Sequence, residues 1–383
     1  MNRFVTLMFL GTLVLNSFAQ IPMFEETEVF VGGQDDINTY RIPSLICTGN
    51  GTLLAFCEGR CNKSQDGSPT HLVLKRSLRN TGPMVPPEHG VPVSRSRERN
   101  LTWQPMQILL RSKNGEAFMN PVPVIDNQIG AIFLLVNHYT SYGNAENEGK
   151  GAAQVWFLKS TDEGSTWTGP VDITSEVGNI ALGPGIGIQL KNGRLVVPVY
   201  DGIIFSDYHG KTWKAGNKTT GPVNESQVVE LVSGTLMLNT RGYPKRIVAF
   251  SSDNGNTWSE PNRDLTLTDS KLWGGCQATL IRYTRTDEGY DKNRLLFANP
   301  ADTLNRFDIT VRMSYDEGKT WPVAKLIKKG TGAYSCLTIF PDDTIGIIYE
   351  TGNYNKDVIE YYSSLSFARF NLEWLTDGED HLH

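Results

Sequence analysis

The amino-acid sequence predicts an all-β fold that is built from a repeated unit, and three observations support this prediction. The octapeptide pattern S-x-D-x-G-x-T-W recurs along the chain. The tryptophans that close its copies are spaced 64, 46, 45 and 63 residues apart, close to the roughly 40–50 residues of one propeller blade with room for inserted loops. No long segment has the 3.6-residue hydrophobic period of an amphipathic helix. A radial β architecture is therefore the first structural hypothesis.

The octapeptide itself is expected to be a scaffold turn. Its complete copies are 160–167, 251–258 and 314–321, and its degenerate copies are 206–213 and 96–103. In Asp-x-Gly, the aspartate accepts hydrogen bonds from nearby backbone N–H groups and the glycine tolerates a positive φ. The tryptophan then supplies a large apolar side chain that packs back on the turn. We therefore expect structural turns here, not catalytic residues.

Strand-like segments are short, rich in β-branched and aromatic residues, and bounded by Gly, Asn, Asp or Pro. They are the ranges 52–56, 71–76, 131–137, 154–159, 194–200, 228–231, 247–251, 294–298, 309–314 and 344–349. The segment 361–375 has no clear period. Two stretches rich in turn-forming residues, 80–100 and 141–151, predict long surface loops.

Residues 1–19 have the composition of a secretory signal peptide. Arg3 precedes an apolar run over 4–15, and small residues flank Phe18 before Gln20. The run is shorter than the roughly 20 residues of a membrane-spanning helix, and no later segment approaches that length. The sequence predicts a signal peptide at 1–19, one domain over 20–383, no transmembrane segment, and a secreted or lumenal protein (extracellular, lysosomal or periplasmic).

Composition limits the expected partners and cofactors. The formal net charge is −5, so the chain has no overall field that favours nucleic acid or an anionic membrane. The five cysteines allow at most two disulfides, and no cysteine–histidine spacing matches a metal site. We therefore expect no metal or other cofactor and no nucleic-acid partner. Any anionic substrate must be bound by local charges.

Arg41 is the first candidate site residue. It stands in Tyr40-Arg41-Ile42-Pro43, at the start of a segment expected to be a buried strand, and the proline removes one ladder donor. A buried guanidinium needs an anion, because an unpaired buried charge costs several kcal/mol. That anion is either an internal carboxylate, for which Glu350 is the candidate, or the carboxylate of a ligand.

The motif Tyr40-Arg41-Ile42-Pro43, together with the repeated octapeptides, resembles the sialidase (exo-α-neuraminidase) superfamily. In that superfamily the octapeptide is known as the Asp box. The resemblance is closest to the animal-type branch and covers nearly the whole chain after residue 19. Four further segments have close counterparts in the family: 52–60, 118–121, 183–189 and 274–277. Asp boxes alone also occur in non-enzymatic propellers, but the ordered set of motifs is specific. The resemblance implies a six-bladed β-propeller with its active site at one end of the axis.

The resemblance also implies three arginines that bind the carboxylate of sialic acid. They match Arg41, Arg241 in Leu-Asn-Thr-Arg, and Arg306 before the strand that leads into the last Asp box. Arg246 and Arg312 are the competing candidates for the second and third positions. The grouping makes chemical sense, since a guanidinium is a planar fork that pairs bidentately with a carboxylate and stays charged at any working pH.

The family's catalytic residues match Tyr334, Glu225 and Asp66. Sialic acid carries its carboxylate on the anomeric carbon, so an attacking carboxylate would meet an anion, whereas a phenol oxygen avoids this repulsion; sialidases use a tyrosine nucleophile. A free phenol has a pKa near 10 and needs a base, a role that matches Glu225, with Glu230 as the competing residue. Asp66, in a loop after Arg60, matches the family's acid/base residue.

The remaining matches are supporting residues that orient the first arginine or contact the substrate: Glu350, Arg60, Asn120, Tyr200 and Gln277. Glu350 matches the glutamate that orients Arg41, and Gln277 lies in a motif at the rim of the family's site. The animal-type pattern has a second tyrosine two residues after the position of Tyr200. This chain has Gly202 there, so binding of the glycerol tail is expected to differ.

The sequence thus predicts a retaining exo-sialidase that removes terminal α-linked sialic acids from glycoproteins, glycolipids such as gangliosides, or oligosaccharides, through a sialyl–Tyr334 intermediate and without a metal. One alternative is a trans-sialidase or an intramolecular, anhydro-forming enzyme, for which Trp273 and the two predicted loops are candidate acceptor-binding features. The other is a non-catalytic sialoglycan-binding propeller, which is disfavoured because the chain keeps Tyr334, Glu225 and Asp66.

Overall fold

The computed structural model describes residues 20–78, 101–113, 115–140, 153–221, 224–354 and 359–383. The predicted signal peptide at 1–19 and the predicted loops at 80–100 and 141–151 lie outside these residues. Within them the fold is all-β, as the sequence predicts. The described helices are short: α1 (Thr174–Val177), α2 (Leu372–Leu375), η1 (Leu272–Gly274) and η2 (Thr286–Glu288). None of them is long and apolar enough to cross a bilayer.

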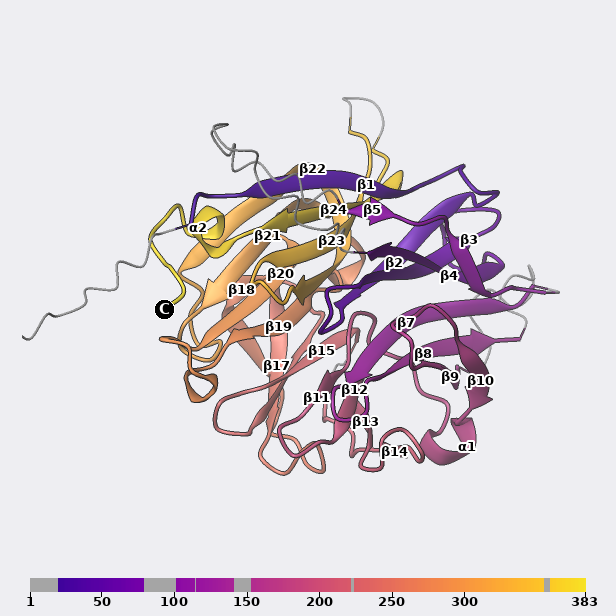
Figure 1. Ribbon diagram of the computed structural model, residues 1–383, viewed down its shortest axis with the longest axis horizontal. Helices are drawn as coiled ribbons and strands as arrows, with labels where there is room; N and C mark the ends of the chain where they lie inside the picture. The colour runs from indigo at the N-terminus through magenta and orange to yellow at the C-terminus, as the bar shows by residue number, and fades with distance from the viewer. Residues whose placement is uncertain (1–19, 79–100, 114, 141–152, 222–223, 355–358) are drawn as a thin grey trace, which may run out of the picture.

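In the part of the chain that the structure describes, the strands form four hydrogen-bonded sheets (Figure 1). From their antiparallel pairings we divide these sheets into six groups. The first two groups lie in one nine-stranded sheet, where a single parallel pair, Thr70 with Ala117, joins them. Group one contains β2 (Thr39–Cys47), β3 (Leu53–Arg60) and β4 (Thr70–Leu78), with β5 (Thr102–Trp103) and β6 (Gln107–Leu110) paired to β4. Group two contains β7 (Ala117–Asp126), β8 (Ala131–Tyr139), β9 (Gln154–Ser160) and β10 (Thr168–Asp172).

The third and fourth groups are separate four-stranded sheets. Group three contains β11 (Ile188–Gln189), β12 (Leu195–Val199), β13 (Gly202–Ser206) and β14 (Lys214–Ala215). Group four contains β15 (Ser226–Glu230), β16 (Leu236–Thr240), β17 (Lys245–Ser251) and β18 (Asn262–Thr268). All ten segments predicted as strands overlap a strand of the structure.

The fifth and sixth groups share one long strand, β22 (Val323–Ile339). Its first half pairs with β21 (Phe307–Ser314) and its second half pairs with β23 (Ile345–Thr351). The other strands are β19 (Thr279–Thr284), β20 (Arg294–Pro300), β24 (Ser364–Phe370) and β1 (Phe24–Val31). β1 pairs with β24, so the first and last strands lie side by side (Figure 1). The segment 361–375, which lacked a clear period, forms β24 and α2.

The Asp-box octapeptides are scaffold turns, as predicted. In the copy at 160–167, Ser160 Oγ accepts a hydrogen bond from the Gly164 N–H at 2.8 Å, and Asp162 accepts bonds from the backbone N–H and the hydroxyl of Thr166 at 2.9 and 2.7 Å. The copies at 251–258 and 314–321 repeat these bonds. Bonds from Thr166 lower the pKa of Asp162 to about 2, so the turn holds a carboxylate at neutral pH.

The residue after the aspartate position of each described box fastens its group to the preceding one. These residues have φ between 55 and 62°, the left-handed region: Glu163, His209, Asn254 and Glu317. Glu163 accepts bonds from the Asn50 and Thr52 side chains in the β2–β3 turn. Glu317 accepts from the backbone N–H of Val232 at 2.8 Å in the β15–β16 turn. The repeated motif therefore links the groups as well as closing turns.

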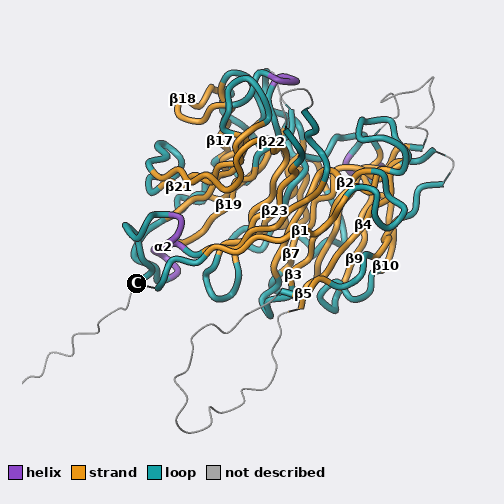
Figure 2. Tube along the Cα trace, turned by 90° about the horizontal axis from the view of Figure 1, so that it is seen from above, coloured by secondary structure: helices purple, strands orange, loops and turns teal. Residues whose placement is uncertain are grey.

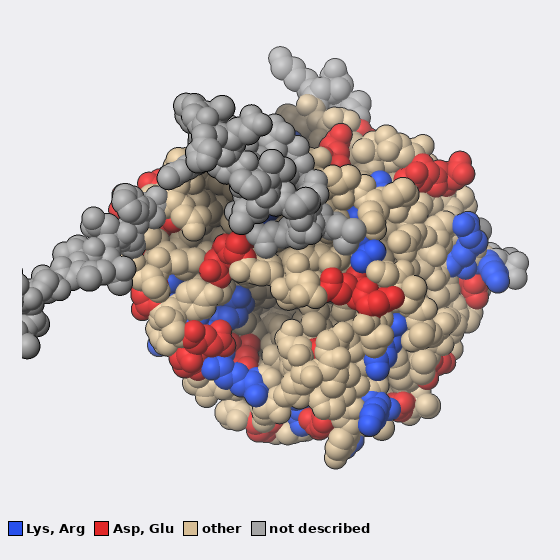
Figure 3. Space-filling view, in the orientation of Figure 1, with Lys and Arg blue, Asp and Glu red and all other residues tan. Residues whose placement is uncertain are grey.

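Apolar side chains fill the spaces between neighbouring groups. One cluster joins Phe133 and Phe157 of group two to Trp213, which stands between β13 and β14 of group three, with ring centroids 5.7–6.3 Å apart. Seen from above, the strands occupy the middle of the molecule and loops gather at both ends of the strands (Figure 2). On the face shown in Figure 3, acidic and basic side chains are interspersed without a broad area of one sign.

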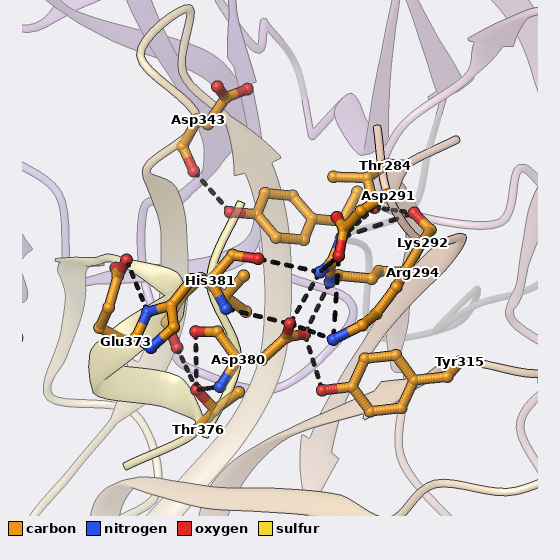
Figure 4. A network of polar contacts seen from close by, with 12 residues as sticks. Thr284, Asp291, Lys292, Arg294, Tyr315, Asp343, Glu373, Thr376, Asp380 and His381 are labelled. Carbon is orange, nitrogen blue, oxygen red and sulfur yellow. Dashed lines mark hydrogen bonds and ion pairs between the residues drawn. The ribbon is translucent and has the colours of Figure 1, made fainter. Parts of the chain in front are cut away.

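A polar network fixes the C-terminal segment against β20 (Figure 4). Arg294 is fully buried and pairs with Asp380 at 2.7 Å and with Asp291 at 3.0 Å. Lys292 and Tyr315 also bond Asp380, at 2.6 and 2.8 Å. Although burial opposes its charge, hydrogen bonds from Arg294 and Lys292 hold the pKa of Asp380 well below its usual range. The segment after α2 is therefore part of the packed fold.

Candidate active site

One large cavity, of about 1580 Å³, brings most of the predicted site residues together. Its walls come from the starts of β2, β7 and β15, the ends of β3, β8 and β16, and the middle of β22. The predicted residues that line it are Arg41, Arg60, Asp66, Asn120, Tyr200, Glu225, Arg241, Arg306 and Tyr334. Residues far apart in the sequence thus meet at one end of the strands.

Strand irregularities lie next to three of these residues. The register of β2, β7 and β22 shifts beside Arg41, Asn120 and Tyr334. Ile42 and Asn120 adopt positive φ values of 55 and 54°, and each precedes a proline, which has no N–H to donate to a ladder. A bulge bends a strand and redirects a side chain. The bulges therefore explain why these side chains line the cavity instead of following the ordinary strand alternation.

Two fully buried glutamates accept the backbone N–H groups at these bulges. Glu350 accepts from Ile42 at 2.9 Å and from Tyr334 at 3.1 Å, and Glu58 accepts from Asn120 at 3.0 Å. Both glutamates are 0% exposed. A buried N–H without a partner is costly, so each carboxylate stabilises the irregular backbone that presents a site residue.

Tyr334 and Glu225 form the centre of the site. The Tyr334 hydroxyl donates a hydrogen bond to Glu225 Oε1, and Arg241 Nη1 donates to Glu225 Oε2 at 2.8 Å and to the Tyr334 hydroxyl at 3.3 Å. Burial raises the pKa of Tyr334 well above 10 and Glu225 raises it further, whereas Arg306 and Arg241 lower it. Glu230, the competing glutamate, accepts from a turn N–H at 3.1 Å and lies outside this cavity.

The other two predicted arginines flank the Tyr334 ring. Their guanidinium carbons lie 5.5 Å (Arg41) and 5.3 Å (Arg306) from its centroid. Arg41 Nε pairs with Glu350 Oε1 at 2.7 Å, as expected for an orienting glutamate, and Arg306 Nη2 donates to the Gly275 carbonyl at 3.0 Å. The three arginines therefore converge on one phenol, the geometry needed to hold an anion beside it.

The competing arginines have structural partners instead. Arg246 is 0% exposed and bonds Asp269 at 2.7 Å and the Cys276 carbonyl at 2.6 Å. Arg312 Nη1 donates to Asn299 at 3.1 Å, and burial lowers the pKa of Arg312. Neither arginine lines the cavity, so the geometry favours Arg241 and Arg306.

Asp66 lies at the mouth of the cavity and pairs with Arg60. Arg60 Nη2 is 2.8 Å from Asp66 Oδ1, and the Asp66 side chain is 69% exposed. Arg60 also donates to the Ser64 carbonyl at 2.5 Å, and Glu58 holds its guanidinium at 2.7 and 2.9 Å. Burial raises the pKa of Glu58, and Arg60 opposes this effect. A buried carboxylate thus fixes the arginine that fastens the Asp66 loop.

The supporting residues divide into two locations. Asn120 and Tyr200 line the cavity, and burial raises the pKa of Tyr200 well above 10. Gln277 is 1% exposed, donates to the Pro184 carbonyl at 3.1 Å and accepts from the Ser335 N–H at 3.0 Å. Gln277, which stands in the family's rim motif, therefore does not line the cavity. Its side chain holds the start of β19 against β22 by its hydrogen bond to Ser335, the residue that follows Tyr334.

Two residues with clear roles in the geometry were not predicted as site residues. Glu58 stands two positions before Arg60 in β3, and the two-residue period of a strand places both side chains on one face; this signal was available. Tyr362 lies between β23 and β24, with its ring 3.6 Å from the guanidinium carbon of Arg41. No pattern in the sequence around Tyr362 indicates this contact.

Comparison with known proteins shows which family the sequence matches. The model of the BNR repeat-like domain family matches residues 87–349. The sialidase of Micromonospora viridifaciens is 31% identical over 92% of this chain and 55% of its own length. The exo-alpha-sialidase of Aspergillus fumigatus is 29% identical, with coverage of 89% and 86%. Sialidase-3 of Mus musculus is 24% identical, with coverage of 89% and 93%. The chain spans only 55% and 61% of the lengths of the Micromonospora and Bacteroides fragilis sialidases.

Solved structures show the same similarity. The Hadza microbial sialidase Hz136 superposes with a TM-score of 0.74 at 29% identity, over 91% of this chain and 69% of that one. The intramolecular trans-sialidase of Ruminococcus gnavus, solved with oseltamivir carboxylate, superposes with a TM-score of 0.72 at 19% identity, over 92% and 98% of the two chains. At that identity the second match concerns the fold alone.

Proposed function

The chain belongs to the sialidase superfamily, and from this premise we propose that it is a retaining exo-sialidase that hydrolyses terminal α-linked sialic acids through a sialyl–Tyr334 intermediate. The observation that carries the proposal is the convergence of Arg41, Arg241 and Arg306 on the Tyr334–Glu225 pair. A site built only to bind a carboxylate has no need of a buried phenol that is hydrogen-bonded to a glutamate.

Substrate binding uses the arginines. The carboxylate of sialic acid lies on the anomeric carbon, so three guanidinium groups around Tyr334 bring that carbon next to the phenol oxygen. Arginine suits this task because its planar fork pairs with both carboxylate oxygens. Glu350 holds Arg41 by its Nε, at 2.7 Å. Arg41 Nη1 has only a longer contact, of 3.4 Å, with the Ser64 carbonyl, so this edge of the guanidinium can turn to the ligand.

The first chemical step forms the bond from Tyr334 Oη to the anomeric carbon and breaks the bond from that carbon to the glycosidic oxygen. Glu225 accepts the phenol proton, which is needed because burial raises the pKa of Tyr334. Asp66 donates a proton to the departing oxygen. A neutral phenol approaches the anomeric carboxylate without the repulsion that an attacking carboxylate would meet.

The second step returns the site to its starting state. Asp66, now a carboxylate, removes a proton from water, whose oxygen attacks the anomeric carbon. The bond from Tyr334 Oη to the anomeric carbon breaks, and the phenol regains its proton from Glu225. Two inversions give net retention of configuration. The exposed position of Asp66 at the cavity mouth suits a group that meets first the leaving oxygen and then water.

The six antiparallel groups also support a finer description of the fold. We propose that they are the blades of a six-bladed β-propeller, that β1 closes it by joining β24, and that residues 20–383 form one catalytic domain. We further propose that residues 1–19 are a signal peptide, that the protein acts outside the cytosol, and that its substrates are sialylated glycoproteins, gangliosides or oligosaccharides.

The second candidate function is a trans-sialidase or intramolecular reaction, and the exposed position of Trp273 supports it. Its side chain is 56% exposed beside the cavity, its φ is 53°, and its carbonyl accepts from Arg241. An exposed ring on strained backbone suits contact with a sugar. Hydrolysis remains the main proposal because nothing in the described residues excludes water from Asp66.

The test is a time-resolved NMR analysis of the reaction with sialyllactose and with a 4-methylumbelliferyl sialoside. We expect α-sialic acid as the first product, followed by mutarotation. A first-formed β anomer would contradict retention. Adding excess lactose separates the second candidate, since sialic acid moved to lactose indicates transfer and an anhydro product indicates the intramolecular reaction. If neither sialoside is turned over, the function that remains is that of a non-catalytic propeller that binds sialoglycans.

A further inference from the structure

Tyr362 lies between two of the carboxylate-binding arginines. It follows β23 and lines the cavity. The guanidinium carbon of Arg41 is 3.6 Å from its ring centroid, and Arg306 Nη1 donates to its hydroxyl at 3.4 Å. One side chain therefore contacts both arginines by two different interactions, and the catalytic steps above give it no role.

The ring of Tyr362 covers the face of Arg41 while Glu350 occupies one edge. Glu350 lies 2.7 Å from Arg41 Nε and 3.5 Å from Nη2. A guanidinium stacked on an aromatic ring gains cation–π attraction and loses rotational freedom. Arg41 is thus fixed on one face and one edge, with a longer contact of 3.4 Å from Nη1 to the Ser64 carbonyl. These contacts leave a defined direction for a ligand's carboxylate.

The hydroxyl of Tyr362 has an unused hydrogen. A phenol hydroxyl donates one bond and also accepts, and this one accepts from Arg306. Among the residues that the structure describes, none accepts its hydrogen. Burial raises the pKa of Tyr362, and Arg41 opposes that effect without cancelling it. The hydroxyl therefore keeps its hydrogen at neutral pH and can donate it to an anion held between Arg41 and Arg306.

We propose that Tyr362 is a fourth carboxylate-binding residue: its ring supports Arg41, and its hydroxyl, polarised by Arg306, donates a hydrogen bond to the carboxylate of the sugar. This inference rests on the proposed function, because it needs an anionic sugar in this cavity. It predicts that Tyr362 contributes to discrimination between the carboxylate and a neutral group of similar size.

The test compares two ligands on two variants. Tyr362→Phe removes only the hydroxyl. Tyr354→Phe is the matched control, because Tyr354 belongs to the same connection between β23 and β24, is 59% exposed and does not line the cavity. The probes are 2,3-didehydro-2-deoxy-N-acetylneuraminic acid and its methyl ester, whose affinities are measured by calorimetry or competition.

We expect Tyr362→Phe to weaken binding of the acid about tenfold, the usual effect of losing one hydrogen bond to a charged group, and to leave binding of the ester unchanged. Tyr354→Phe should change neither affinity. Tyr362→Leu, which also removes the ring, should weaken the acid further, with thermal unfolding measured to confirm that the variant is folded.

An unchanged ratio of acid to ester affinity in Tyr362→Phe would overturn the inference, whether both affinities fall together or neither moves. Failure of the proposed function has a different signature, because it appears in the wild type as absence of binding to the acid and absence of sialoside turnover.

Discussion

The hydroxyl of Tyr334 donates a hydrogen bond to Glu225, a residue 109 positions earlier in the chain. The second oxygen of that carboxylate accepts from Arg241 at 2.8 Å. A buried phenol is thereby joined to a base and to a cation at once. The glutamate provides the destination for the phenol proton, and the arginine keeps the glutamate oriented and balances its charge.

Replacing Glu225 with glutamine should lower kcat by roughly 10²–10⁴-fold, because the amide cannot accept the phenol proton. The raised pKa of Tyr334 adds a pH signature. Below that pKa the phenolate fraction increases tenfold per pH unit, so the residual rate of Glu225→Gln should rise with pH across the alkaline range. Glu230→Gln, which alters a turn contact, is the control and should keep wild-type kcat. Equal kcat values for the two variants would show that Glu225 is not the base that accepts the Tyr334 proton.

Arg241→Lys and Arg246→Lys should separate binding from folding. An ammonium cannot reproduce the bidentate fork, so Arg241→Lys should raise KM at least about tenfold, as expected for a lost charge-assisted contact. Arg246 is buried against Asp269, so Arg246→Lys should lower the melting temperature and leave KM near wild type. Steady-state kinetics and thermal unfolding check both. If KM rises only in Arg246→Lys, the second carboxylate-binding arginine has been misassigned.

Glu58→Gln should loosen the mouth of the site. Arg60 is 1% exposed, and removing the partner of a buried charge costs roughly 3–5 kcal/mol, so the free energy of unfolding should fall by about that range. Activity should fall as well, since Arg60 fastens the loop that carries Asp66. Urea unfolding and kcat/KM provide the two measurements. A variant as stable and as active as wild type would show that Arg60 needs no buried counter-charge.

Asp253→Asn should give a pH-dependent loss of stability. Bonds from Thr257 lower the pKa of Asp253 to about 2, from 3.8. A depressed folded-state pKa stabilises the protein above the unfolded-state value and loses that effect as pH falls towards the folded-state value. The stability difference from wild type should therefore be constant between pH 7 and 5 and shrink below pH 4. Urea titrations measure it, with the exposed Asp36→Asn as control. A difference that stays constant down to pH 3 would contradict this assignment.

Much of the fold follows from local chemistry that the sequence displays. The Asp-box turns were predictable because Ser, Asp, Gly and Thr form their hydrogen bonds within eight residues, as the bonds of Asp162 with Thr166 demonstrate. The strands were predictable from short β-branched segments. The sharing of β22 between two groups was not predictable from the sequence, because each half of the strand pairs with a different partner, β21 or β23.

A site residue was predictable where it lies in a recognisable motif. It was less predictable where only contacts between distant parts of the chain place it in the site. Arg41 and Glu350 pair as expected. Glu58 could have been recognised from its two-residue spacing to Arg60, whereas Tyr362 has no signal outside the folded structure. For Gln277, membership of a rim motif does not reveal which way the side chain packs.

Covalent trapping tests the central claim most directly. A 2,3-difluoro sialic acid loses fluoride from the anomeric carbon, and its C3 fluorine slows hydrolysis of the resulting intermediate. After incubation, quenching and proteolysis, mass spectrometry should find the fluorosialyl group on Tyr334 in the wild type, with no labelled peptide in Tyr334→Phe. A label on Glu225 or Asp66, or equal labelling of the two proteins, would contradict Tyr334 as the nucleophile.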